Sequence, residues 1–391
     1  MTVAPPATEL PLDDPVALTQ ALVRCASVTP EDHGALDIAQ RALEALGFSV
    51  ERLPFSQAGT PDVDNLYARR GSGRPHFAFA GHTDVVPPGA LNQWSVDPFA
   101  GEIRGGRLIA RGAADMKGAI ACFLVALKRY LSRHPSGRGT LSLIITGDEE
   151  GPAINGTKKV LEWMAERGER PDACLTGEPT NPERLGEMIK IGRRGSLNAH
   201  LTVHGVQAHV GYPHLADNPI HRLLAMLAAL RAEPLDRGTE HFQPSHLEIT
   251  TIDVGNEAIN IIPAEARARF NVRFNTLHTP TSIEAWIRQR LDAVGGRYEL
   301  SILITGEAFL SLPGPFSALI ARVVERVTGL RPALTTLGGT SDSRFIKNYC
   351  PVLDFGLVGA TMHKVDEAVP LEDLRTLSAI YEAILEDFFA H

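Results

Sequence analysis

Short apolar runs alternate with longer segments of helical spacing through the first half of the chain, and this alternation limits the fold more than any other feature. The runs cover residues 77–80, 141–146 and 173–176, and glycine follows each of them. Apolar side chains recur every three or four positions in residues 16–25, 117–134 and 157–167. Such alternation is typical of a mostly parallel sheet covered by helices. We therefore predict an α/β domain, which resumes with a helix at 316–328 and a strand at 352–355.

The middle of the chain follows a different pattern. Residues 266–275 alternate apolar and polar side chains, as expected of a strand with one buried face. Strands are predicted at 196–204, 247–254, 266–275 and 298–304, and helices at 218–232 and 282–295. This β-α-β-β-α-β order is typical of a ferredoxin-like sandwich. We predict an inserted domain over residues 195–305, within a discontinuous first domain over residues 1–194 and 306–391.

Composition excludes several classes of function. The chain carries 38 Lys and Arg against 46 Asp and Glu, a net charge of -8, which disfavours a nucleic-acid or membrane-surface partner. No apolar run approaches the roughly 18 residues of a membrane span. The start, MTVAPPATELPLDDP, lacks the basic cluster and apolar core of a secretory signal, and the four cysteines form no CxxC pair. We expect a cytoplasmic protein that acts on a small molecule, with no nucleic-acid or membrane partner.

Side chains able to bind a metal follow most of the predicted strands. In chain order they are His82, Asp84, Asp115, Glu149, Glu150, Glu178 and His363. A single acid or histidine at a turn is most often a cap or a solvated charge. Recurrence after five apolar segments indicates a site, because ligand sites of open α/β sheets form beyond the carboxyl ends of the strands.

The residue types fit a pair of zinc ions. Imidazole and carboxylate groups both suit Zn²⁺, and no cysteine stands near them. Three carboxylates are more than one zinc ion usually gathers, and they suit two metals about 3.5–4 Å apart that share a bridging carboxylate. Asp84, two residues after His82, is placed to accept the second N–H of that imidazole. The pattern therefore favours a hydrolase with two metals.

Five motifs carry a family resemblance. GHTDVVP, ARGAADMKG, GDEEG, GEP and MHKVDE occur in the order seen in the zinc aminoacylase and carboxypeptidase G-like metallohydrolases. Longer strings, including GVQAHVGYPHLADNPIH and GGTSDSRF, resemble the desuccinylase branch of this family. The resemblance runs from near residue 15 to near residue 385. It implies hydrolysis of N-succinyl-LL-2,6-diaminopimelate to succinate and LL-2,6-diaminopimelate.

The resemblance also implies metal ligands. Those of two Zn²⁺ per subunit would be His82 with Glu178, Glu150 with His363, and Asp115 as the bridge. The bond from Asp115 to Met116 is cis in the family. Glu149 is implied as the general base, although the residues alone leave open whether Glu149 or Glu150 is the base. Co²⁺ suits the same ligands as Zn²⁺.

Substrate contacts follow from the same resemblance. The implied residues are Arg194, Tyr212, Asn260, Arg273, Gly339 and Thr340. Arginines suit a substrate with several carboxylates, although an arginine on a strand is often only a solvated surface charge. His209 is implied to reach the active site of the partner subunit in a homodimer and to stabilise the oxyanion. Gly359 stands where many family members have Asn, so one substrate hydrogen bond of the family pattern is missing or supplied otherwise.

Three alternatives stay open. Acetylornithine deacetylase, an aminoacylase or a dipeptidase would use the same metal residues, and only the substrate-side strings favour the desuccinylase. A non-catalytic homologue that binds a metal or ligand is a second alternative, although the complete ligand set together with Glu149 argues against it. A structural or nucleic-acid-binding protein finds no support in the charge balance.

Overall fold

The computed structural model describes residues 10–390, which form two compact units. The first unit contains the residues up to Ile191, Ser311–Thr335 and the residues from Ser341 onward, and the second contains Gly192–Leu310 and Thr336–Thr340. The predicted insertion over residues 195–305 begins and ends within a few residues of the long segment of the second unit, and Thr336–Thr340 lies outside that insertion. Residues 1–9, which include most of the segment used to predict the absence of a secretory signal, lie outside the described residues.

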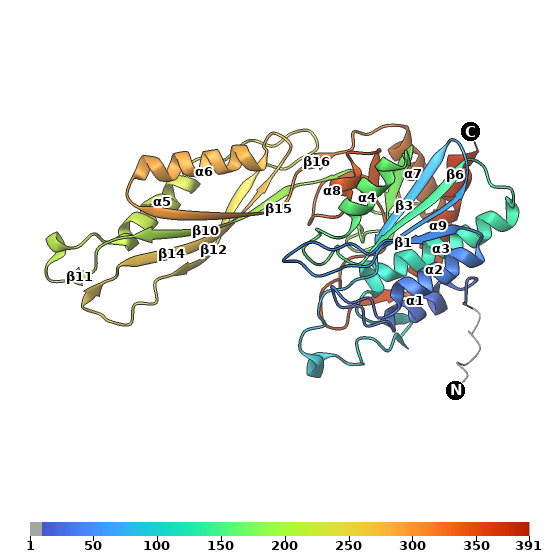
Figure 1. Cartoon of the computed structure of the whole chain (residues 1–391), viewed down its shortest axis with the longest axis horizontal. Helices are drawn as coiled ribbons and strands as arrows, with labels where there is room; N and C mark the ends of the chain where they lie inside the picture. The colour runs from blue at the N-terminus through green and yellow to red at the C-terminus, as the bar shows by residue number, and fades with distance from the viewer. Residues whose placement is uncertain (1–9, 391) are drawn as a thin grey trace. The chain divides into compact units, whose positions relative to one another are not determined.

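A mixed, mostly parallel sheet forms the centre of the first unit, which confirms the predicted α/β fold (Figure 1). Its parallel core has the order β6 (Thr140–Thr146), β3 (His76–His82), β7 (Ala173–Thr176) and β18 (Val352–Asp354). Antiparallel β2 (Leu66–Gly71) and β1 (Ser49–Arg52) extend one edge, and β8 (Met188–Lys190) and β17 (Ala333–Thr335) the other. Every residue of β3 and β6 is buried, so these strands lie in the core.

Helices cover the sheet of the first unit. They are α1 (Pro15–Val23), α2 (Ala35–Ala45), α3 (Gly118–Arg133), α4 (Thr157–Glu166), α7 (Pro315–Thr328), α8 (Ser343–Ile346) and α9 (Leu371–Phe389). Asp14 caps α1 by accepting a hydrogen bond from the Val16 N–H, as the Asp-Pro start predicts. Helices α1, α3 and α9 pack on one another, and Phe123 of α3 stacks on Phe79 of β3 with ring centroids 4.0 Å apart.

Two local details of the first unit bear on the position of Asp115. The short strand before it, β5 (Arg107–Ile109), pairs with β4 (Glu102–Arg104) and β19 (Ala368–Pro370) in a separate antiparallel sheet and not with the central one. Gly81 does not end β3, which continues to His82. A Cβ at Gly81 would lie 2.8 Å from the Met116 Cε atom, so glycine makes room for that side chain.

The second unit has a four-stranded antiparallel sheet in the order β12 (His246–Asp253), β14 (Glu265–Phe274), β10 (Gly195–His204) and β15 (Tyr298–Gly306). Helices α5 (Pro219–Arg231) and α6 (Pro280–Val294) pack against its apolar face (Figure 1). The chain order is the predicted β-α-β-β-α-β. Two short pairs complete the unit: β11 (Ala208–His209) with β13 (Ile261–Ile262), and β9 (Gly192–Arg193) with β16 (Phe309–Leu310).

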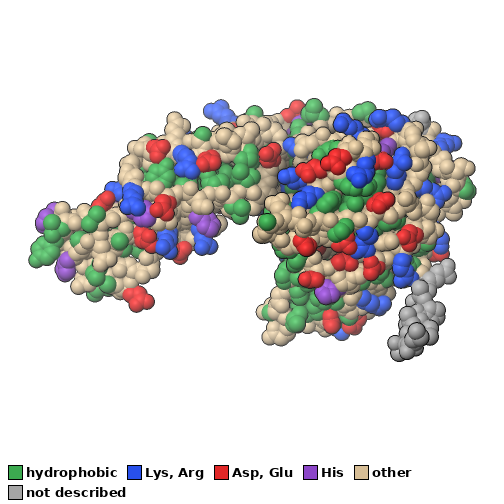
Figure 2. All heavy atoms as spheres, in the orientation of Figure 1, with side chains coloured by type: hydrophobic (Ala, Val, Ile, Leu, Met, Phe, Trp, Pro, Cys, Tyr) green, Lys and Arg blue, Asp and Glu red, His purple; other side chains and the backbone are tan. Residues whose placement is uncertain are grey.

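Acidic and basic side chains are interspersed over the face of the molecule drawn in Figure 2. Among residues 10–390, no helix is both long enough and apolar enough to cross a bilayer. All four cysteines are free, and three of them are buried.

Candidate active site

The predicted metal ligands come from separate segments of the first unit. His82 ends β3, Glu150 follows β6 and Glu178 follows β7. Asp115 lies in the irregular turn Ala113–Lys117 before α3, and its bond to Met116 is cis, as the resemblance implied. His363 lies in the loop after β18. The structure brings these side chains together at the carboxyl edge of the sheet.

Asp115 lies at the centre of this cluster. Its Oδ1 atom is 3.3 Å from the Nε2 atom of His82, and its Oδ2 atom is 3.0 Å from the Nε2 atom of His363. The Oε1 atom of Glu178 is 3.8 Å from His82 Nε2, and the Oε1 atom of Glu150 is 2.8 Å from His363 Nε2. Two groups of three ligands therefore share one carboxylate, and within each group the ligand atoms lie within 4.8 Å of one another.

Two atoms of the cluster are buried without a hydrogen bond. They are Nε2 of His82 and Oδ1 of Asp115, neither of which has a hydrogen-bond partner among the described residues. Leaving a polar group in this state costs about 1–3 kcal/mol. A cation between these atoms would remove that cost, and imidazole nitrogen with carboxylate oxygen is a donor set that Zn²⁺ accepts. The residues thus fit a divalent metal ion.

Negative charge dominates the electrostatics of the cluster. Burial opposes protonation of His82, but Asp115 and Glu149 outweigh it and raise the pKa of His82 well above its usual range. Asp115 and Glu150 raise the pKa of His363 to about 10. Burial tends to raise the pKa of Asp115, but the two imidazoles lower it below its usual range. The carboxylates thus favour positive charge at this position, which a bound cation would supply.

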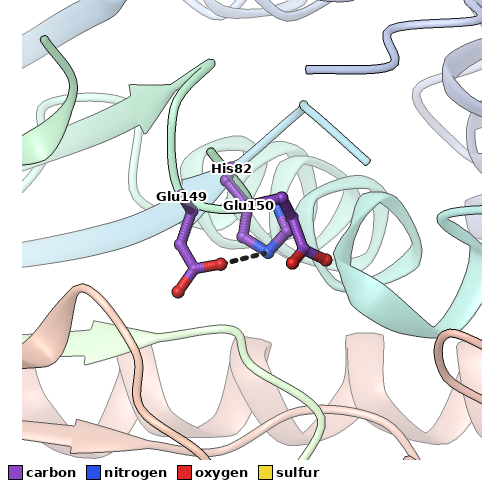
Figure 3. A group of neighbouring side chains, drawn as sticks. All are labelled: His82, Glu149 and Glu150. Atoms are coloured by element: carbon purple, nitrogen blue, oxygen red, sulfur yellow. Dashed lines mark ion pairs between the residues drawn. The ribbon is translucent and has the colours of Figure 1, made fainter. Parts of the chain in front are cut away.

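Glu149 stands apart from the two groups that share Asp115. Figure 3 shows its carboxylate on one side of the His82 ring and the carboxylate of Glu150 on the other. Its Oε2 atom lies 4.0 Å from His82 Nε2, and Glu149, Glu150 and His82 form a third group of possible ligands. Burial, and then the charge of Glu178, raise the pKa of Glu149 well above its usual range. A carboxyl group with a raised pKa is suited to proton transfer.

Asp84 does not act as predicted. The Nδ1 atom of His82 lies 2.9 Å from the backbone oxygen of Asp84, whereas the Asp84 carboxylate is 3.6 Å away. The backbone carbonyl therefore accepts the imidazole N–H and turns Nε2 toward the cluster. The carboxylate instead accepts the backbone N–H groups of Glu149 at 3.2 Å and Glu150 at 3.0 Å. Asp84 thus holds the turn that carries both glutamates.

A small pocket beside the cluster contains residues that the sequence did not single out as site residues. Its lining consists of Ala80, Gly81, His82, Met116, Glu149, Thr157, Thr176, Glu178 and Asp342. Asp342 is buried, and burial raises the pKa of its carboxyl group. Asp342 belongs to the GGTSD string, but only Gly339 and Thr340 of this string were predicted as site residues.

The remaining predicted residues belong to the second unit. His209, Tyr212 and Asn260 lie together where β11 meets β13: the Val210 N–H donates to the Asn260 carbonyl at 3.0 Å, and the His209 and Tyr212 rings are 5.7 Å apart. Both His209 and Tyr212 are exposed.

Arg194 and Arg273 lie at the opposite end of the strand β10. Arg194 precedes the strand, and Arg273 pairs with Ser196 in its register. Gly339 is nearby, because its carbonyl accepts a hydrogen bond of 3.1 Å from Nη1 of Arg193, a residue that was not predicted. β10 has ten residues, so its two ends are about 33 Å apart.

Comparison with known proteins agrees with this architecture. Residues 78–387 match Peptidase family M20/M25/M40. A succinyl-diaminopimelate desuccinylase of Rhodospirillum centenum is 61% identical over 377 residues, which cover 96% of this chain and 98% of that protein. A desuccinylase of the same name from Parvibaculum lavamentivorans is 58% identical, with 96% of each chain covered.

Among solved structures, the aminopeptidase PepT of Bacillus cereus superimposes with a TM-score of 0.79 at 21% identity, over 98% of this chain and all of that one. At this identity the likeness shows the fold alone. The extent of the family match and the identity to the two desuccinylases together show that the chain belongs to Peptidase family M20/M25/M40.

Proposed function

We propose that the chain hydrolyses N-succinyl-LL-2,6-diaminopimelate to succinate and LL-2,6-diaminopimelate, with two Zn²⁺ ions bound in the first unit. The observation that carries the metal part is the position of Asp115, whose two carboxylate oxygens face the two histidines at 3.3 and 3.0 Å. The substrate rests on the printed name of relatives that are up to 61% identical over nearly the whole chain. Co²⁺ is an alternative metal for the same ligands.

In this proposal His82 and Glu178 would hold one cation, Glu150 and His363 would hold the other, and Asp115 would contribute a carboxylate oxygen to each. Bound cations supply Lewis acidity, which makes water nucleophilic near neutral pH and polarises a carbonyl group. Glu149 accepts the proton of the attacking water and later donates it to the departing amine. Its position 4.0 Å from Nε2 of His82 places it beside the proposed cations and outside the two groups that share Asp115.

The second unit supplies the groups that bind the substrate. Arg194 and Arg273 are partly buried, and burial lowers the pKa of both guanidinium groups. The charge of Arg194 further lowers that of Arg273, which indicates that the two cations are neighbours. A pair of neighbouring guanidinium groups suits the carboxylates of a succinylated diamino acid. Thr340 is proposed as a further polar contact, and Tyr212 and Asn260, which lie with His209, as contacts to the substrate of the partner subunit.

We propose a homodimer because the predicted substrate contacts lie at opposite ends of β10 in one chain. Arg194 and Arg273 lie at one end and His209 at the other. The substrate has a chain of about a dozen atoms and extends on the order of 15 Å. It cannot span the roughly 33 Å between the two ends of β10 within one chain. His209 therefore serves the active site of the partner subunit, where it stabilises the oxyanion. Four free cysteines are consistent with a reducing cytoplasm, which we propose as the location.

The central test combines elemental analysis of the purified protein with hydrolysis assays. We expect two zinc ions per chain, and a kcat/KM for N-succinyl-LL-2,6-diaminopimelate that exceeds that for N-acetylornithine at least tenfold. Preference for N-acetylornithine or for a dipeptide would replace the substrate assignment with a related amidohydrolase. Two bound metals without hydrolysis of any of these compounds would favour the non-catalytic homologue.

The dimer has its own test. Size-exclusion chromatography with light scattering should give twice the chain mass at micromolar concentration. His209→Ala should lower turnover by about a hundredfold or more with unchanged metal content, because one oxyanion donor is typically worth about 3 kcal/mol. His214→Ala, which changes an exposed histidine of the same segment, is the matched control. A monomer with full activity would refute the role of His209.

A further inference from the structure

The carboxylate of Glu367 is completely buried and receives hydrogen bonds from four donors. Its Oε2 atom accepts from Nη1 of Arg111 at 2.6 Å and from the Gly112 N–H at 3.2 Å. Its Oε1 atom accepts from the Ala114 N–H at 2.8 Å and from the Asp115 N–H at 3.1 Å. One side chain therefore binds most of the turn that delivers the proposed bridging ligand.

The turn depends on these bonds because it is not a regular helix. Asp115 and Met116 have non-helical φ and ψ angles, and α3 begins only at Gly118. A buried backbone N–H without an acceptor is costly, so an acceptor is needed from elsewhere in the chain. Glu367 supplies that acceptor to three consecutive or near-consecutive N–H groups, and thereby fixes where the Asp115 carboxylate points.

Glu367 also belongs to the segment that carries His363, four residues earlier. The Glu367 backbone oxygen accepts a hydrogen bond of 2.9 Å from the Ala110 N–H, and the next residue enters β19, which pairs with β5. The side chain and the backbone of Glu367 thus join the His363 loop to the Asp115 turn. These are the two segments whose side chains, 3.0 Å apart, line one of the two proposed cation positions.

The charge of Glu367 is balanced within the protein. Arg111 is also buried, with 2% of its surface exposed, and its guanidinium group lies 5.4 Å from the centre of the Trp94 ring. A buried ion pair is weak support for stability, and removal of one partner leaves an uncompensated buried charge. Stability alone therefore does not account for the buried Arg111–Glu367 pair. The hydrogen bonds that Glu367 accepts from the Asp115 turn give the pair a second role.

We propose that Glu367 is a positioning residue for the dinuclear metal site: through the Asp115 turn and the His363 loop it sets the distance between the bridging carboxylate and the second histidine. The inference rests on the proposed metal site but not on the proposed substrate. It predicts a specific defect in the Asp115–Glu150–His363 position. The other cation position depends less on Glu367, because His82 and Glu178 are anchored by strands β3 and β7.

The test uses Glu367→Gln, which keeps the size of the side chain but removes its charge and one acceptor oxygen. Zn²⁺ binding to the metal-free full-length protein is measured by calorimetry, and the absorption spectrum of the Co²⁺-loaded protein is recorded. We expect one of the two Zn²⁺ ions to bind about 10–100-fold more weakly, the range found when groups that orient metal ligands are removed. We also expect a changed Co²⁺ spectrum, which a purely structural defect in a folded protein would not produce.

A matched control is available in the second unit. Asp236 is a buried carboxylate that accepts the backbone N–H groups of Gly238 and Ser245 and the side-chain amide of Asn275. Asp236→Asn should lower the free energy of unfolding without a change in either Zn²⁺ affinity. Because Glu367→Gln leaves Arg111 unpaired, the double variant R111M/E367Q repeats the measurement without an unpaired buried charge.

The outcomes separate the inference from the proposed function. Unchanged affinity for both Zn²⁺ ions in a folded Glu367 variant, or an equal loss in Asp236→Asn, would overturn the positioning role. If neither Glu367 variant folds, the residue is structural and the proposal fails. A wild-type protein that binds two Zn²⁺ ions but does not hydrolyse the succinylated substrate would refute the proposed substrate and leave this test intact.

Discussion

The strand β3 carries a buried histidine at each end, and the surroundings of the two ends shift the pKa values of these histidines in opposite directions. Burial, followed by the charge of Arg69, lowers the pKa of His76 to about 4. His82 is more deeply buried, yet its pKa is raised well above the usual range, because the carboxylates around it outweigh the effect of burial. The two histidines are only six positions apart in the sequence.

The difference shows how one sheet provides a structural edge and a chemical edge. At the amino edge, His76 is a neutral side chain whose Nε2 atom lies 2.8 Å from the hydroxyl of Ser142. At the carboxyl edge, acidic groups from several segments gather around His82. Burial by itself therefore lowers the pKa of a histidine, and several carboxylates close to the imidazole are needed to raise it again. Such an excess of carboxylates marks the edge at which a cation binds.

The largest effect is expected at the carboxyl edge from Glu149→Ala. Turnover should fall about 10²–10⁴-fold, which is the contribution that a positioned general base makes to the rate. Elemental analysis should show unchanged metal content, since Glu149 lies outside the two groups that share Asp115. Glu166→Ala, at the exposed end of α4, is the control and should keep full activity. Near-normal turnover of the Glu149 variant would disprove its role as the base.

A smaller effect at the same edge is expected from Asp84→Asn. The amide keeps one acceptor oxygen but cannot accept both backbone N–H groups of Glu149 and Glu150, so kcat should fall about 10–100-fold. Metal content should be retained, because the backbone carbonyl of Asp84, not its carboxylate, accepts the N–H of His82. Asp97→Asn alters an exposed turn aspartate of similar bonding and should have no effect. Loss of metal in the Asp84 variant would restore the role predicted from the sequence.

His76→Gln, at the amino edge, should have the smallest effect on turnover at neutral pH. Its effect should instead appear in the pH dependence of the free energy of unfolding. Since the pKa of His76 is about 4 in the folded protein and about 6.5 when unfolded, the unfolded chain binds more protons between these values. The contribution of His76 to the free energy of unfolding of the wild type should therefore be present in full above about pH 6.5 and should be lost as the pH falls toward 4. This contribution is at most about 3 kcal/mol.

Urea unfolding of the His76 variant at a series of pH values measures this contribution. His76→Gln should lack that part of the pH dependence, whereas Ser142→Ala, which keeps the imidazole, should retain the slope. An identical slope in the wild type and the His76 variant would show that burial does not depress the pKa of this histidine.

Much of the fold is readable from periodicity. β7 occurs at the predicted residues 173–176, and α3, α4 and β6 lie within a residue or so of their predicted ends. These segments are either long helices or strands buried along their whole length, so local pattern and burial agree. Helix α9, which packs on α3, was not among the predicted elements, and neither were the edge strands β1 and β2.

The site was predictable in its residue types but not in its connections. The motifs pointed to the residues that gather around Asp115, because acids and histidines recur after apolar segments. No pattern in the sequence shows that the backbone of Asp84 bonds His82, since any residue has a carbonyl group there. Glu367 was missed for a similar reason. Its partners Arg111 and Asp115 lie about 250 residues away in the chain, and only the folded structure brings them into contact.

One carboxylate serving two positions also has a thermodynamic consequence. The two oxygens of Asp115 face the two positions, so a cation at one position would draw on the charge of the same carboxylate that a cation at the other position needs. Repulsion between two cations so close together would add to this effect. The affinity for either Zn²⁺ ion should therefore depend on whether the other position is filled, and the two ions should bind with unequal stepwise constants.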